Sequence, residues 1–160
     1  MRVLGIDPGY GRVGFGLVEK QGSKLTAIDY GVIETPQIAM PDRLSMIYER
    51  TLELFREGKP DALATERLLF TVNKTTAMDV SKALGVILLA SAREGLPWGE
   101  YSPPEVKQSV VGNGAAEKKQ VQFMVARLLS LGAPPKPDDA ADALAIAICH
   151  LFRAGVPARR

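Results

Sequence analysis

Apolar and polar residues alternate along the first 34 residues of the chain, a pattern typical of strands that bury one face. Two short runs further along predict two more strands. The five predicted strands span residues 2–7, 12–19, 25–34, 61–66 and 97–101. Because the first three follow one another through short connections, we expect them to form an antiparallel meander at one side of a sheet.

In the rest of the chain, apolar residues recur at the spacing of helices, and glycine, proline or a small polar residue marks most helix ends. Ser102-Pro103-Pro104-Glu105 combines an N-cap, a first-turn proline and a capping-box glutamate. Asn73 and Asp138 are the expected N-caps of two other helices. The predicted helices span residues 41 or 42 to 58, 74–93, 103–112, 116–131 and 138–152.

Three strands followed by strands alternating with helices predict an α/β fold with a mixed five-stranded sheet. At 160 residues we expect a single domain, with residues 154–160 as a flexible tail. Cys149 is the only cysteine, so no intrachain disulfide is possible, and the apolar run Ala143–Cys149 is far too short to span a membrane. These features predict a soluble, cytoplasmic protein.

Four carboxylates suggest the chemistry. Asp7 ends the first predicted strand and Glu66 ends the fourth, while Asp139 and Asp142 lie three residues apart on one face of a helix. With no Lys or Arg expected beside them, clustered acids would repel one another unless a hard divalent cation lay between them. Oxygen ligands suit Mg²⁺ or Mn²⁺, and two such ions about 3.5–4 Å apart catalyse phosphodiester hydrolysis. The acids therefore indicate a nuclease.

Some of these acids also have a simpler interpretation. Asp7 before Pro8-Gly9 is compatible with a turn-forming aspartate or with the phosphate loop of an actin-like sugar kinase. Asp139 would favour the helix dipole without any ligand. The helix dipole does not explain Asp142, because an almost wholly apolar stretch of helix follows it. An acid at the edge of such a buried stretch needs a partner.

Net charge is only +2, but Ser102–Lys136 carries five basic residues against two acids. Three lysines of this segment flank the glycines of 112–114, where backbone amides and ammonium groups can approach phosphate: Lys107, Lys118 and Lys119. Phe70 is a candidate for stacking on bases. These residues predict a nucleic-acid substrate.

Four segments of the chain resemble the RuvC-type Holliday-junction resolvases: GIDPG, ATERLLFTVNKTTAMDVSKALG, YSPPEVKQSVVGNGAAEKKQV and PKPDDAADALAIAICH. The resemblance spans the whole chain and implies a ribonuclease H-like fold. It places the family's catalytic, metal-binding acids on Asp7, Glu66, Asp139 and Asp142, and its important basic positions on Lys107 and Lys118.

The resemblance also assigns the loop 67–74, with Asn73 and Lys74, to gripping and opening the junction. The family commonly has a wedging aromatic residue three positions after the strand glutamate. This chain has Leu69 there and Phe70 next to it, so either side chain is a candidate wedge.

By resemblance, we expect a homodimer that binds two Mg²⁺ per active site, with Mn²⁺ as an alternative. Its dimer interface would be the helix at 74–93. It would nick four-way junction DNA symmetrically, leave 5′ phosphates and 3′ hydroxyls, and act with RuvA and RuvB in DNA recombination and repair. One alternative is a nuclease of the same fold that acts on RNA or another branched substrate. A second is an actin-like phosphotransferase, although 160 residues leave no room for its second domain. A third is an inactive junction-binding module.

Overall fold

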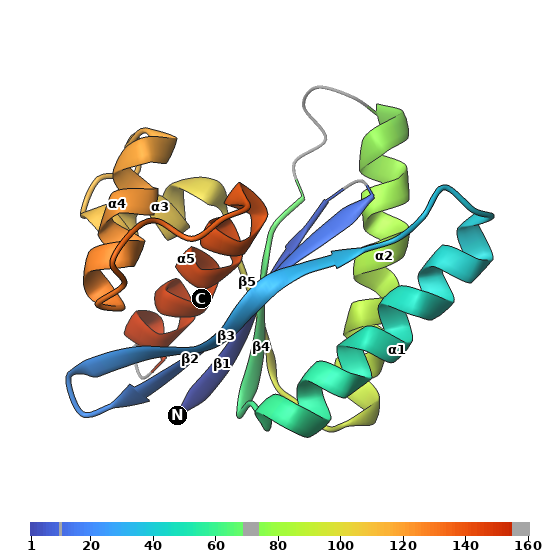
Figure 1. Cartoon of the computed structure of the whole chain (residues 1–160), viewed down its shortest axis with the longest axis horizontal. Helices are drawn as coiled ribbons and strands as arrows, with labels where there is room; N and C mark the ends of the chain where they lie inside the picture. Colours follow the sequence, from blue (N-terminus) through green and yellow to red (C-terminus); the bar gives the residue numbers. More distant parts are fainter. Residues whose placement is uncertain (10, 69–73, 155–160) are drawn as a thin grey trace, which may run out of the picture.

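Five strands form one mixed sheet in the order β3-β2-β1-β4-β5 (Figure 1). The strands are β1 (Arg2–Pro8), β2 (Arg12–Gln21), β3 (Lys24–Glu34), β4 (Ala62–Glu66) and β5 (Trp98–Tyr101). The structure, a computed structural model, describes residues 1–9, 11–68 and 74–154, without the side chains of residues 74 and 75. The first three strands are antiparallel, whereas β1, β4 and β5 run parallel. The predicted meander and mixed five-stranded sheet are confirmed.

Helices cover both faces of the sheet. Those described are α1 (Met40–Gly58), α2 (Lys74–Arg93), α3 (Pro103–Val111), α4 (Lys118–Leu128) and α5 (Asp138–Arg153). α1 and α2 pack on one face, and α5 packs on the other with α3 and α4 behind it (Figure 1). None of the described helices is long and apolar enough to cross a membrane.

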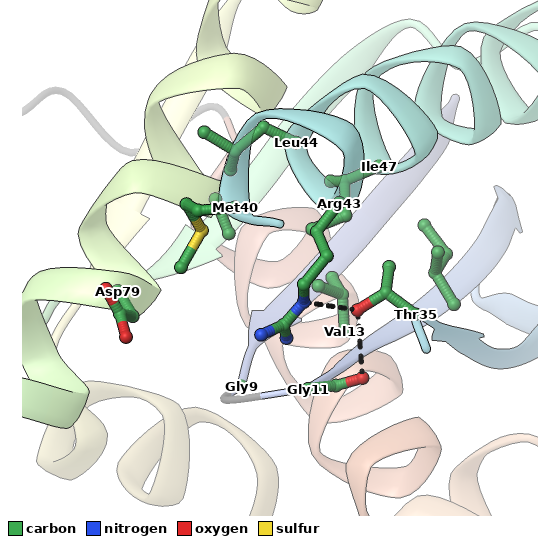
Figure 2. Close-up of a pocket in the computed structure, with 11 residues that line it drawn as sticks. Gly9, Gly11, Val13, Thr35, Met40, Arg43, Leu44, Ile47 and Asp79 are labelled. Carbon is green, nitrogen blue, oxygen red and sulfur yellow. Dashed lines mark hydrogen bonds between the residues drawn. The ribbon is translucent and has the colours of Figure 1, made fainter. Parts of the chain in front are cut away.

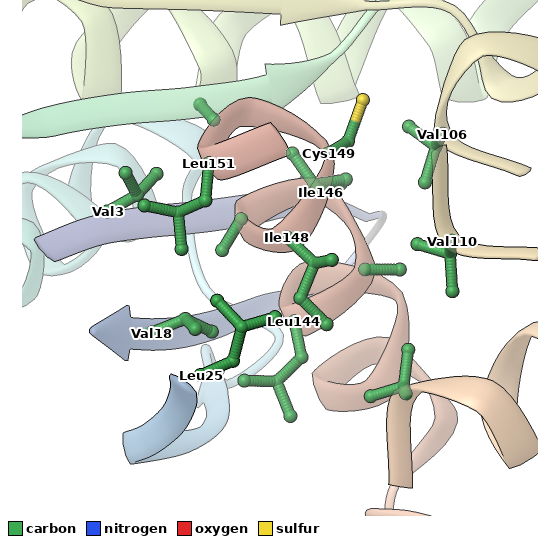
Figure 3. Close-up of a cluster of buried hydrophobic side chains, with 14 of the residues drawn as sticks. Val3, Val18, Leu25, Val106, Val110, Leu144, Ile146, Ile148, Cys149 and Leu151 are labelled. Atoms are coloured by element: carbon green, nitrogen blue, oxygen red, sulfur yellow. The ribbon is translucent and has the colours of Figure 1, made fainter. Parts of the chain in front are cut away.

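α5 lies at the centre of one hydrophobic core. Its residues from Ala143 to Cys149 are all buried, because the sheet packs on one side of the helix and α3 and α4 pack on the other (Figure 3). A helix that is apolar on all sides belongs in such a position. The core therefore fixes the direction of α5 and the location of its first turn.

Glycines in the sheet let α5 come unusually close. A Cβ at Gly14 would lie 2.1 Å from the carbonyl oxygen of Asp139, and one at Gly5 would lie 2.1 Å from that of Ala143. Real side chains do not fit at such separations. Gly14 pairs with Asp7 across β1 and β2, so this contact places the start of α5 beside the end of β1.

One predicted N-cap and one predicted helix span were wrong. α5 starts at Asp138 as its predicted span required, but Pro137 occupies the N-cap position, and the Asp138 carboxylate lies 3.4 Å from the Lys118 ammonium. α4 is shorter than 116–131: Glu117 caps its start in a capping box, and Ser130, with a φ of 54°, prevents the helix from continuing. The capping box of α3 is confirmed, since the Ser102 backbone amide donates to Glu105 at 2.9 Å.

Candidate active site

The fold brings the four predicted acids to one end of the sheet. Asp7 lies at the end of β1 and Glu66 ends β4, and the pairing of Ile6 with Thr65 puts these two parallel strand ends side by side. Asp139 and Asp142 lie in the first turns of α5. The close contact of α5 with Gly14 holds these turns against the same end of the sheet. Segments separated by more than 130 residues thus meet at one place.

The acids affect one another's ionisation. Burial raises the pKa of Asp7 from 3.8 to about 7, and the negative charges of Asp142, Glu66 and Asp139 add to this rise. Burial also raises the pKa of Glu66 and of Asp142. Desolvated carboxylates that repel one another are a costly arrangement, and such arrangements concentrate at functional sites.

The expectation that no cation lies beside these acids was wrong. The Lys118 ammonium donates to Asp142 Oδ2 at 3.0 Å, and an Arg12 guanidinium nitrogen lies 3.1 Å from Asp139 Oδ2. Lys118 comes from the first residue of α4 and Arg12 from the first residue of β2, so neither is close in sequence to the acid that it contacts. Arg12 was missed entirely, although the predicted β1–β2 turn places it near Asp7.

A divalent cation fits the donor set, because every candidate ligand is a carboxylate oxygen. Asp139 Oδ2 supports this, since it is buried and accepts no hydrogen bond within the described structure, despite the nearby arginine. The side chains are not arranged as a finished metal centre: among the described residues, no three His, Cys, Asp or Glu side chains are grouped closely enough to hold an ion. Asp139 and Asp142 would exchange their contacts with Arg12 and Lys118 for contacts with the cation.

A cleft of about 230 Å³ opens beside the acids. Glu66 and Asp142 line it together with Lys107 and Lys118, and the apolar part of its wall comes from Pro103, Val106, Val121 and Ala145. Positive charge from Lys107 and Lys118 counters the rise in the pKa of Glu66. A cleft lined by both acids and lysines suits a phosphodiester, whose charge the lysines can offset.

The other predicted DNA contacts differ in their placement. Lys119 is exposed on α4 and does not line the cleft. Leu69, Phe70 and Asn73 lie outside the described residues, and so does the side chain of Lys74, the first residue of α2. Their roles stay predictions.

We expect stability without divalent cations to fall as pH rises. Asp7 keeps its proton to about pH 7 in the folded state but loses it near 3.8 when unfolded, so the folded state binds more protons between these values. Raising the pH through this window should cost up to about 4 kcal/mol, since one pKa unit corresponds to about 1.4 kcal/mol. Thermal melts with chelator from pH 5 to 8 measure the upper part of this loss, about 3 kcal/mol.

Asp7→Asn provides the matched control, because asparagine does not titrate. Its melting temperature should fall less steeply with pH than that of the wild type. Mg²⁺ should raise the wild-type melting temperature more at pH 8 than at pH 5, because protonated carboxyls bind cations poorly. Identical pH profiles for the two proteins would contradict the buried, coupled carboxyl.

The chain has a mixed five-stranded sheet, with two acids at strand ends and two more in the first turns of a neighbouring helix. This arrangement defines a nuclease domain of the ribonuclease H-like class. Residues 3–150 match the family model described as Crossover junction endodeoxyribonuclease RuvC. The chain belongs to the RuvC family of crossover junction endodeoxyribonucleases.

Known RuvC proteins are similar to this chain along nearly its whole length. The crossover junction endodeoxyribonuclease RuvC of Syntrophomonas wolfei is 53% identical over 94% of this chain and 88% of the relative. A Thermus thermophilus RuvC structure superposes with a TM-score of 0.90 at 39% identity, covering 97% of this chain and 96% of that one. T. thermophilus RuvC in complex with a Holliday junction substrate also gives a TM-score of 0.90, at 36% identity and with 98% and 97% coverage.

Proposed function

We propose that this chain resolves Holliday junctions by hydrolysing one phosphodiester bond in each of two opposed strands. The observation that carries the proposal is the meeting of Asp7, Glu66, Asp139 and Asp142 beside a lysine-lined cleft. The similarity to a RuvC whose structure is known in complex with a Holliday junction substrate supports four-way junction DNA as the substrate. The reaction would serve DNA recombination and repair in the cytoplasm.

Two divalent cations, Mg²⁺ or alternatively Mn²⁺, would be held by these four carboxylates and would supply an activated water and charge stabilisation at the leaving oxygen. Asp7 is the best candidate to contact both, because the other three acids each raise its pKa. Water attack on phosphorus with cleavage of the bond to the 3′ oxygen leaves a 5′ phosphate and a 3′ hydroxyl. Such nicks can be ligated.

Lys107 and Lys118 would hold the scissile strand. Both line the cleft with Glu66 and Asp142, and an ammonium group there lies where a phosphate would approach the acids. When DNA and cations bind, Lys118 would leave Asp142 and contact phosphate instead. Lys119 and the loop 67–74, including Asn73 and Lys74, would grip the junction, with Leu69 or Phe70 as the wedge.

A four-way junction has twofold symmetry, so paired nicks require two equivalent sites and a homodimer. α2 is the candidate interface, because it exposes large apolar side chains: 59% of Met78 and 52% of Leu89 are accessible in the single chain. Exposed apolar residues on one helix are typical of protein contacts. RuvA and RuvB are the proposed partners in branch migration.

Cleavage of a labelled mobile four-way junction tests the function against matched linear duplex DNA and structured RNA, each with Mg²⁺, Mn²⁺ or chelator. We expect paired, symmetric nicks in the junction alone, in the presence of either metal and not with chelator. Equal cutting of the duplex would contradict junction selectivity. Cleavage of RNA alone would favour the RNA-processing alternative.

A further inference from the structure

A chain of hydrogen bonds connects the start of α1 to the residue that precedes β2 (Figure 2). The Arg43 guanidinium donates from Nε to Thr35 Oγ1 at 3.0 Å. The Thr35 hydroxyl in turn donates to the carbonyl oxygen of Gly11 at 3.5 Å, and the Thr35 backbone amide donates to the same oxygen at 3.3 Å. The three residues line a small pocket between the β1–β2 connection and the start of α1.

These contacts tie three separate elements together. Gly11 precedes β2, Thr35 follows directly after β3, and Arg43 lies in the first turn of α1. Gly11 has a φ of 79°, a backbone conformation that favours glycine. The amide and the hydroxyl of Thr35 both donate to its carbonyl oxygen. The backbone at Gly11 is therefore held from outside the β1–β2 hairpin.

The position of Gly11 matters because functional groups lie on both sides of it. Arg12 follows directly, and its guanidinium lies 3.1 Å from Asp139 Oδ2. Asp7 lies on the opposite strand of the hairpin, where it pairs with Gly14. A shift of Gly11 would therefore move Arg12 and disturb the register that aims Asp7 at the other acids.

We propose that Thr35 and Arg43 are positioning residues for the proposed active site. They act through Gly11 to hold Asp7 and Arg12 in the geometry that the carboxylate site needs, and touch neither substrate nor metal. This inference rests on the proposed function for the role of Asp7. It adds two residues that lie outside the acid cluster and its lysine-lined cleft.

A matched pair of variants at Thr35 isolates the hydroxyl. Thr35→Val keeps the side-chain shape and the backbone amide contact but removes the acceptor for Arg43, whereas Thr35→Ser retains a hydroxyl. Misplacing a catalytic group by about 1 Å can cost about 100-fold in rate. Because Thr35 acts through Gly11, we expect a smaller fall in kcat for junction cleavage, about tenfold in Thr35→Val, with the junction Kd in chelator unchanged, and Thr35→Ser to restore kcat.

A second readout separates positioning from a general loss of structure. Mn²⁺ titration of the DNA-free protein, followed by electron paramagnetic resonance, should show weaker binding to Thr35→Val and near wild-type binding to Thr35→Ser. Thermal melts confirm that each variant is folded at the assay temperature. If Thr35→Val unfolds there, Arg43→Met replaces it, with the same expected split between kcat and junction Kd.

Equal kcat and Mn²⁺ affinity in Thr35→Val and the wild type would overturn the positioning role. A parallel loss in Thr35→Ser would also overturn it, because the hydroxyl would then not be the group that matters. Wild-type protein that fails to cut junctions would instead count against the proposed function. The Mn²⁺ comparison still tests the positioning role in that case, because it requires no cleavage.

Discussion

Asp7→Asn should reduce metal-dependent junction cleavage by about 1,000-fold or more, since a site of this kind relies on charge placed where the reaction needs it. Asn has almost the same shape as Asp but carries no charge. Asp7 is the acid whose pKa all three other carboxylates raise, so removing its charge changes the centre of the cluster. Single-turnover cleavage of a labelled junction measures the effect.

Binding provides the necessary comparison, because the junction Kd of Asp7→Asn should match that of the wild type in chelator. The control variant is Asp138→Asn, which removes a carboxylate of the same neighbourhood that is 62% exposed and belongs to no predicted ligand set. It should cleave within about threefold of the wild type, in the range of surface substitutions. Strong cleavage by Asp7→Asn would exclude Asp7 from the reaction centre.

Gly14→Ala should damage stability and activity together. Its Cβ would lie 2.1 Å from the Asp139 carbonyl oxygen and 3.0 Å from the Asp139 Cβ, so the first turn of α5 must move away from β2. Overpacking of a tight contact typically costs about 1–3 kcal/mol. Misplacing a catalytic group by about 1 Å can cost about 100-fold in rate, and we expect a loss of that order in kcat.

Gly132→Ala is the matched control, because a Cβ at Gly132 would meet nothing within 4 Å. Its melting temperature and cleavage rate should stay at wild-type values. Differential scanning calorimetry and single-turnover cleavage distinguish the two variants. Wild-type behaviour of Gly14→Ala would show that α5 does not depend on the close approach to β2.

Features of the fold that follow directly from the spacing of residues could be predicted from the sequence. Alternating apolar positions located the strands and placed Asp7 and Glu66 at strand ends. The parallel pairing of β1 with β4, which puts these two ends side by side, came from the structure. The three-residue spacing of Asp139 and Asp142 placed them on one helical face in any fold. The structure brings these four acids to one end of the sheet, and their binding of cations stays a prediction.

Features that depend on packing could not be predicted in the same way. The contact between Lys118 and Asp142 joins α4 to α5, and its existence depends on how α4 lies behind α5. The pair of Arg12 and Asp139 likewise requires α5 to cross β2 at Gly14. Asp138 was assigned as an N-cap from local preference alone, whereas in the structure its carboxylate lies 3.4 Å from a lysine of another helix.

The burial of α5 divides the site into parts of different mobility. The apolar stretch from Ala143 to Cys149 can open only when the core between the sheet, α3 and α4 comes apart, so amide exchange there requires global unfolding. Lys118, by contrast, lies on the terminal turn of α4, with 54% of its side chain exposed. Asp139 and Asp142 lie in the first turns of α5, directly before this buried stretch, while the ammonium group that contacts Asp142 can be released by fraying of a single helical turn.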